Sequence, residues 1–279
     1  MFSTLKFIAT GLLVLPCLLP VPRAEAALLE KHTGDGGYIT TNDAPSWTGG
    51  LYVESGKDYY INTLLGRGDR PSVRSTFAFS GTKSIQARVR SGGTDVKSRS
   101  EVYLVNPNKW YERQTRFVGF AVYVPSYVDY TSDRWVNFMQ VQHGPTTPSI
   151  ALYPEPVSGD KTSYRLRLSL NWRNGDADGE KNQTNPKIGV FKKGVWNQFV
   201  IEARMDYRDN GIAKIHYKDG TTWKIIHSYT GPLGNAWTKA EHNDVDVHYG
   251  VYCQGGQFDD IEHYFDNLRF ATTLDEAKP

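Results

Sequence analysis

The chain has little cysteine, with two residues in 279. Cys17 lies in an N-terminal segment that we predict to be removed, so only Cys253 remains. An intramolecular disulfide is then excluded, and a hydrophobic core must hold the fold.

The chain also has little excess of positive over negative charge. The formal net charge is +2 and the pI is near 8.3, whereas nucleic-acid-binding proteins are usually more basic. We therefore predict no nucleic-acid partner.

The sequence also lacks the patterns of several other classes. The histidines show no paired spacing of the kind that holds zinc. The E-x-D-x-E strand common among retaining glycosidases with a β-sandwich does not occur. The acidic run at 259–262 departs from that motif, and we predict a turn there. After residue 26 we find no convincing amphipathic helix, internal repeat or interdomain linker.

The N-terminus has the features of a secretory signal peptide. Lys6 precedes an apolar run at 7–21, and small residues follow at 24–27. The run is short and interrupted by prolines, which makes a membrane-spanning helix a poor interpretation. We predict that residues 1–26 are removed and that 27–279 form a single secreted, extracellular domain with no membrane association.

The rest of the chain favours β-structure. It contains 26 Gly, and aromatic residues make up 13% of the sequence. Short runs that alternate apolar and polar residues recur between Gly, Pro, Asn and Asp. They predict strands at 84–90, 117–124, 135–142, 164–172, 199–205, 212–217, 245–253 and 264–270. This pattern predicts an all-β fold, a jelly roll of two antiparallel sheets.

Two segments are predicted to be irregular. Residues 174–194 form a long polar stretch, which we interpret as a loop that either covers a cleft or is disordered. Residues 145–156 contain four prolines and are predicted to form a stiff surface segment.

One predicted strand carries several basic residues on one face. Arg165, Arg167 and Arg173, with Asn171 between them, alternate with leucines that would enter the core. Such a row would give a cationic groove for a polyanion. The alternative is a solvated outer surface.

The strand at 245–253 places unusual groups on one face. Asp246, His248, Gly250, Tyr252 and the following Gln254 alternate with apolar residues. The gap at Gly250 would let a ligand approach the backbone between the imidazole and the phenol. This arrangement suits a sugar-binding floor with proton-transfer groups. The alternative is an exposed strand with ordinary polar side chains.

Two further clusters could bind or transfer charge. Arg99, Glu101 and Tyr103 share a face, and arginine is well suited to clamping a carboxylate. A simple surface ion pair between Arg99 and Glu101 is the alternative. In the other cluster Gln140 and Gln142 share a face while His143 turns to the opposite one. A bulge at the strand end would bring His143 beside Gln142, and otherwise His143 hydrogen-bonds within a turn.

Together the three segments resemble the jelly-roll alginate lyases, which carry R-S-E, Q-x-H and Y-F-K-x-G-x-Y-x-Q in that order. The resemblance covers about 77–270 and includes Tyr264-Phe265-Asp266-Asn267-Leu268, which is similar to the closing strand of the group. Here Q-V-Q-H replaces Q-x-H, and Asp246 and His248 replace the first Tyr and the Lys. These departures are closer to the glucuronan lyases and heparin-lyase-like polysaccharide lyases.

The resemblance implies a polysaccharide lyase that cleaves a uronic-acid polymer by β-elimination, with β-1,4-glucuronan as the first choice and alginate as the second. Arg99, helped by Gln142 or Gln140, would neutralise the substrate carboxylate. Tyr252 would take the C5 proton and protonate the leaving C4 oxygen. Because the ordinary pKa of tyrosine is about 10, Arg99 and a protonated His248 would have to stabilise its phenolate. The alternative base is His143, with Tyr252 left as the acid.

The predicted site falls into two groups. The catalytic residues are Arg99, Gln142, His143 and Tyr252. The substrate-binding residues are Glu101, Gln140, Arg165, Arg167, Asn171, Arg173, His248 and Gln254. We predict a monomer whose partner is an anionic polysaccharide and which needs no cofactor or catalytic metal. A structural calcium ion held by aspartates near the sheet edges is left open. A non-catalytic, lectin-like carbohydrate-binding protein is the alternative from another class.

Overall fold

The computed structural model describes residues 27–40, 50–54, 57–62, 69–91, 97–104, 110–130, 134–143, 147–174, 180–235, 244–254 and 259–279. The predicted signal peptide lies outside these ranges. Strands dominate the described residues, and a short helix, α1 (Leu274–Ala277), follows the last strand. No helix in these ranges is long and apolar enough to cross a membrane.

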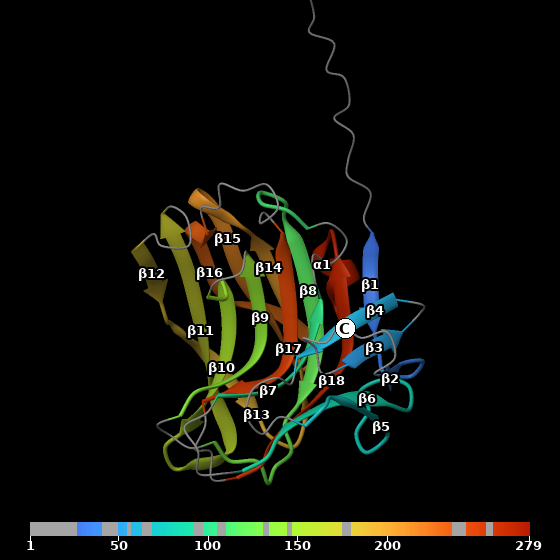
Figure 1. Ribbon diagram of the computed structural model, residues 1–279. Coiled ribbons are helices and arrows are strands. Elements are labelled where there is room, and N and C mark those ends of the chain that lie inside the picture. The colour runs from blue at the N-terminus through green and yellow to red at the C-terminus, as the bar shows by residue number, and fades with distance from the viewer. Residues whose placement is uncertain are drawn as a thin grey trace, which may run out of the picture.

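The strands form two antiparallel sheets. In Figure 1 the sheet with β9 (Val136–His143), β10 (Ile150–Val157) and β11 (Asp160–Asn174) lies in front of the sheet with β14 (Trp196–Arg204), β15 (Asp206–Asp219) and β16 (Thr222–Asn235). We call the first the front sheet. Its order is β2 (Tyr38–Thr40), β3 (Gly50–Glu54), β4 (Lys57–Asn62), β7 (Ser98–Leu104), β17 (Val245–Cys253), β9 (Val136–His143), β10 (Ile150–Val157) and β11 (Asp160–Asn174). Two strands then pair with different parts of β11, namely β12 (Glu180–Thr184) and β13 (Lys187–Lys192).

The second sheet, which we call the back sheet, lies on the other side of the core. Its order is β5 (Ser72–Arg74), β6 (Ser84–Val89), β18 (Ile261–Ala271), β8 (Arg116–Tyr123), β14 (Trp196–Arg204), β15 (Asp206–Asp219) and β16 (Thr222–Asn235). The N-terminal strand β1 (Leu28–His32) also pairs with β18. The two sheets meet where Trp172 and Arg173 of β11 pair in parallel with the end of β16.

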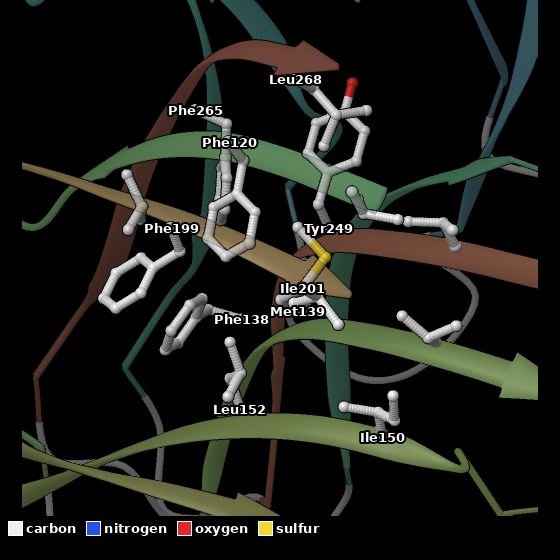
Figure 2. Packing of buried hydrophobic residues seen from close by; sticks show 14 of the residues in the cluster. Phe120, Phe138, Met139, Ile150, Leu152, Phe199, Ile201, Tyr249, Phe265 and Leu268 are labelled. Carbon is white, nitrogen blue, oxygen red and sulfur yellow. The ribbon is translucent and has the colours of Figure 1, made fainter. Parts of the chain in front are cut away.

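The core lies between the sheets and consists of apolar side chains from both (Figure 2). Phe120 of β8 stacks on Phe199 of β14, with ring centroids 5.5 Å apart. Phe120 also contacts Phe138 of β9 across the sandwich, at 6.2 Å and edge-on. Replacing such a ring by alanine costs about 3–5 kcal/mol. Because inward and outward residues alternate along a strand, packing one face fixes which side chains point away from the core.

The fold confirms the predicted class and the eight predicted strands, which correspond to β6, β8, β9, β11, β14, β15, β17 and β18. Two segments differ from the prediction. Residues 150–157, expected to be a stiff surface segment, form β10. Its prolines at 154 and 156 are tolerated because β10 pairs with β9 only as far as Leu152, which leaves one edge without a described strand.

The predicted loop at 174–194 is also wrong, since 180–184 and 187–192 are strands β12 and β13. Both lie at the edge of the front sheet, where polar residues are tolerated. Their polar composition therefore gave no sign of a strand. The acidic run at 259–262, placed in a turn, ends inside β18, which begins at Ile261.

Candidate active site

A cleft of about 750 Å³ lies on the front sheet. Along β7, β9 and β17 its lining residues alternate with residues that enter the core. The described lining consists of Lys97, Arg99, Tyr103, Trp135, Asn137, Gln140, Gln142, Thr147, Pro148, Tyr153, Arg167, Lys181, Gln183, Asn185, His248 and Tyr252.

The charge of this lining has one sign. Lys97, Arg99, Arg167 and Lys181 are permanent cations, and none of the described lining residues is Asp or Glu. The protein as a whole carries a net charge of only +2. The positive charge is therefore concentrated in the concave site, which attracts and orients a polyanion.

At one end of the cleft Tyr252 lies opposite Arg99 of β7 and Asn137 of β9. The guanidinium carbon of Arg99 is 3.9 Å from the centroid of the Tyr252 ring. The ring of Trp135 packs edge-on with that of this tyrosine, with centroids 4.8 Å apart. A group that can transfer a proton is thus held against a group that can bind a carboxylate.

His248 lies further along β17, opposite Tyr103 of β7 and Gln140 of β9. It is buried, and its ring packs against that of Tyr103 with centroids 4.1 Å apart. Neither ring nitrogen of His248 has a hydrogen-bond partner within the described part of the chain. The imidazole therefore keeps its full hydrogen-bonding capacity for a ligand in the cleft.

Two other tyrosines of the lining are held as neutral phenols. Burial, and after it the carboxylate of Asp246, raise the pKa of Tyr103, which donates a 2.9 Å hydrogen bond to that carboxylate. Burial also raises the pKa of Tyr153, although the nearby Arg167 acts in the opposite direction. Both side chains therefore remain protonated at neutral pH and can contribute polar contacts to a sugar.

Glu101 does not line the cleft but lies beneath it, with no exposed surface. Its Oε1 accepts a 2.5 Å hydrogen bond from Nε2 of Gln140. Its Oε2 lies 3.8 Å from Nε of Arg99 and 4.0 Å from Nδ1 of His248. The expectation that Glu101 binds substrate directly is therefore wrong, since burial keeps its carboxylate from the cleft.

Strand β9 contributes three amides to the lining. Gln140 and Gln142 share a face as predicted, opposite His248 and Asp246. The pairing of β9 with β17 then shifts register between Tyr249 and Tyr252. As a result Asn137, three residues before Gln140, also reaches the cleft. Simple alternation could not reveal Asn137, because regular strands place residues three apart on opposite faces.

His143 does not reach the cleft. It pairs in register with Val245, so the predicted bulge at this end of β9 is absent. Its ring is fully buried, and its Nδ1 accepts a hydrogen bond of 3.2 Å from the backbone N–H of Asn235 in β16. The proposal that His143 lies beside Gln142 as the base is therefore wrong. The ring instead packs where the two sheets join.

The arginine row on β11 contributes one residue to the cleft. Arg167 lies over the ring of Tyr153 at 4.8 Å, and its Nε is 3.1 Å from Oε1 of Glu155. Arg165 and Arg173 are half-buried but do not belong to the lining. Asn171 is buried and donates to the carbonyl of Pro148 at 2.7 Å, which ties down the segment that borders the cleft. Gln254 also lies outside the lining.

Several lining residues were not predicted. They are Lys97, Trp135, Asn137, Thr147, Pro148, Tyr153, Lys181, Gln183 and Asn185. Three of them come from the segment interpreted as a loop. Within the described residues there is no group of three or more His, Cys, Asp or Glu side chains that could hold a metal ion.

Known proteins share this architecture. The family model described as polysaccharide lyase matches residues 39–269. An endo-β-1,4-glucuronan lyase from the fungus Trichoderma reesei superimposes with a TM-score of 0.65 at 13% identity, over 87% of this chain and 97% of that one. A marine alginate lyase from Aplysia kurodai gives a TM-score of 0.46 at 11% identity, over 74% and 90%.

An alginate lyase from Pseudomonas aeruginosa gives a TM-score of 0.44 at 11% identity, over 74% of this chain and 86% of that one. A search of curated protein sequences finds no match. At 13% identity the superposition on the Trichoderma reesei structure establishes the fold alone, a jelly roll, while the family match spans most of the chain. The chain belongs to the polysaccharide lyase family.

Proposed function

We propose that this polysaccharide lyase cleaves a uronic-acid polymer by β-elimination, with β-1,4-glucuronan as its substrate. The contact of Arg99 with Tyr252 carries the proposal, because it places a carboxylate clamp 3.9 Å from the ring of a proton-transfer group. The cationic lining, without a described Asp or Glu, supports an anionic polymer. The choice of glucuronan over alginate is supported by the similarity to the Trichoderma reesei glucuronan lyase.

In the proposed reaction the substrate carboxylate binds to Arg99 and to the amide of Gln140 or Gln142. Neutralising this carboxylate makes the adjacent C5 proton acidic enough to remove. The phenolate of Tyr252 takes that proton, and the C5–H electron pair becomes the C4=C5 double bond. The C4–O bond breaks, and the tyrosine returns its new proton to the leaving oxygen. One residue suffices because the C5 proton and the C4 oxygen of β-1,4-linked glucuronate lie on the same side of the ring.

His248 remains the alternative base. Four residues separate it from Tyr252, which at a strand rise of ~3.3 Å corresponds to about 13 Å along β17. Gly250 lies between them and projects no side chain into this interval. A sugar ring over Gly250 would therefore have the phenol on one side and the imidazole on the other. In that arrangement His248 would take the proton and Tyr252 would act as the acid.

The test is the ultraviolet absorbance of the unsaturated product, measured with purified protein on glucuronan, alginate, heparin and pectate in parallel. We expect absorbance to rise on glucuronan. Tyr252→Phe should reduce the rate by about 10²–10⁴-fold, because it removes the proton-transfer group. Tyr127→Phe is the matched control, since Tyr127 is exposed and bonded to Glu262 of the back sheet.

Three outcomes would contradict the proposal in whole or in part. Binding to the polymers without any rise in absorbance would favour a lectin-like protein. A Tyr252→Phe variant as active as the wild type would exclude this tyrosine as base and acid and would favour His248. A rise on alginate alone would replace glucuronan as the substrate while leaving the reaction unchanged.

We also propose that the enzyme is exported and acts as an extracellular monomer without a cofactor. The basic and apolar pattern of residues 1–26 supports export. The protein recovered from the culture medium should have the mass of a chain that begins near residue 27. Light scattering should give the mass of one chain, and a metal chelator should leave the activity unchanged.

A further inference from the structure

Glu101 contacts one cleft residue from each of three neighbouring strands. These are Arg99 on β7, Gln140 on β9 and His248 on β17, at 3.8, 2.5 and 4.0 Å. A buried carboxylate is costly unless cations or hydrogen-bond donors surround it. We therefore expect the carboxylate to have a role that offsets the cost of its burial. All three of its neighbours belong to the cleft lining, which places that role in the site.

The packing of β17 against β7 fixes where this carboxylate lies. Glu101 pairs with Gly250, midway between His248 and Tyr252 along β17. A Cβ at Gly250 would lie 2.2 Å from the carbonyl oxygen of Ser100 and 2.7 Å from Cα of Glu101. The φ of Gly250 is 145°, a conformation that other residues rarely adopt. Only glycine at 250 lets the two strands approach closely enough to hold Glu101 beneath both ends of the site.

The cluster is incomplete as a hydrogen-bond network. Nε of Arg99, Oε2 of Glu101 and both ring nitrogens of His248 are buried without a hydrogen-bond partner among the described residues. Most buried polar atoms in native proteins have such a partner, and exceptions need an explanation. Here the groups are close enough to attract one another but not bonded, and Arg99 and His248 both line the cleft.

We infer that Glu101 is a positioning residue of the lyase site, which holds Arg99, Gln140 and His248 in the arrangement that the transition state requires without touching the substrate. This inference rests on the proposed function. The carboxylate fixes the amide of Gln140 through a hydrogen bond and attracts the guanidinium of Arg99 from below. The guanidinium N–H groups that do not face Glu101 and the second amide N–H of Gln140 then remain as donors for the substrate carboxylate.

The test is Glu101→Gln, which keeps the size of the side chain and removes its charge. We expect kcat on glucuronan to fall on the order of 10²-fold, as for other small displacements of catalytic groups. The affinity for an oligosaccharide of glucuronic acid, measured by calorimetry in a Tyr252→Phe background, should change by less than about threefold. A selective loss of kcat indicates an interaction used in the transition state, whereas a substrate contact would also weaken binding.

Glu202→Gln is the matched control. Glu202 is another largely buried carboxylate, paired with Lys214 and His216 on the back sheet, and its loss should leave kcat unchanged. Glu101→Asp provides a second test if Glu101→Gln does not fold. It keeps the charge but withdraws it by one methylene group, so we expect kcat to fall about tenfold, less than the ~10²-fold loss expected for Glu101→Gln, and stability to stay closer to that of the wild type.

A folded Glu101→Gln or Glu101→Asp variant with kcat within about twofold of the wild type would overturn the inference. So would an equal loss of kcat and of oligosaccharide affinity. The two proposals fail in distinguishable ways. A wild-type protein without lyase activity on any of the four polymers would overturn the proposed function and this inference together. An active wild type with an equally active Glu101→Gln would overturn the inference alone.

Discussion

The two sheets each carry a carboxylate flanked by a histidine and a basic residue, fully buried in Glu101 and largely buried in Glu202, but the two clusters are bonded differently. On the back sheet Glu202 is 2.7 Å from Nζ of Lys214 and 3.3 Å from Nε2 of His216, and each carboxylate oxygen has its own partner. On the front sheet the corresponding contacts of Glu101 with Arg99 and His248 are 3.8 and 4.0 Å.

We interpret the difference as one between a cluster that stabilises the fold and a cluster that takes part in the proposed function. The back cluster is complete, so its groups have little capacity left for a ligand. The front cluster keeps donors and an acceptor unbonded within the described residues, at the floor of a cationic cleft. Sites that bind or catalyse are where proteins tolerate such incomplete networks. The two clusters therefore have similar residues but different proposed roles, and substitutions in each cluster can distinguish these roles.

The largest effect should follow from removing the cation of the front cluster. Arg99→Ala should lower kcat/KM by about 10³-fold, or about 4 kcal/mol of transition-state stabilisation, because the substrate carboxylate loses its clamp. Arg99→Lys should recover only part of this, because an ammonium group lacks the planar fork. Lys214→Ala, which removes the cation of the back cluster, should leave activity unchanged. Initial rates of ultraviolet absorbance on glucuronan measure all three.

The comparison would break if Lys214→Ala and Arg99→Ala lowered activity equally. In that case both clusters would act through the stability of the fold. Thermal unfolding of each variant separates the two causes, because a partly exposed ion pair such as Lys214 with Glu202 contributes less than about 1 kcal/mol.

The fold was largely predictable because its core strands alternate. Leu166, Leu168 and Leu170 of β11 show a period of two, and such strands were found to within a few residues. The edge strands β12 and β13 and the proline-containing β10 were missed. An edge strand pairs with a neighbour on one side only and does not require an apolar face. Polar or proline-containing sequences can therefore form edge strands without showing the alternating pattern.

The site was predictable only where each strand remains regular. Arg99, Gln140, Gln142, His248 and Tyr252 follow from alternation and all line the cleft. Asn137 was missed because the pairing of β9 with β17 shifts register beside it, which brings it to the cleft. His143 was misplaced because the sequence does not show that Asn235 of β16 would bind its ring. Contacts between distant segments decide these cases, and no local pattern encodes them.

Another buried histidine sharpens the contrast. His263 is buried more deeply than His248, but both its ring nitrogens have partners, Oη of Tyr130 at 2.6 Å and the carbonyl of Gly250 at 3.3 Å. Burial lowers the pKa of His263 to about 4, against the weaker opposing effect of the Gly250 backbone. The folded protein therefore binds fewer protons than the unfolded chain between about pH 6.5 and 4.

We expect the free energy of unfolding to fall as pH drops through this window, by about 3 kcal/mol from His263 alone. In His263→Phe that part of the decline should disappear. Urea unfolding followed by tryptophan fluorescence at several pH values measures it. Asp266, whose pKa burial raises to about 6, contributes with the opposite sign in both proteins and cancels in the difference. Equal pH dependence in both proteins would contradict the assignment.

The smallest effect should come from a residue that combines features of both clusters. Arg167 lines the cleft like Arg99, but it is already paired with Glu155 at 3.1 Å, as Lys214 is with Glu202. Four strand spacings separate β11 from β7, about 19 Å at ~4.8 Å each. In the proposed complex Arg167 would therefore meet a different sugar of the bound chain from the one at Arg99.

Arg167→Gln should raise KM for long glucuronan about tenfold with kcat nearly unchanged, because it removes a contact made equally in the ground and transition states. Arg165→Gln is the control, since Arg165 lies on the same strand but outside the cleft lining. Steady-state kinetics on long and short oligosaccharides should show the effect only for chains that reach β11. A loss of kcat in Arg167→Gln would instead place Arg167 with Arg99 in the catalytic group, and pairing with a carboxylate would then no longer distinguish structural from functional cations.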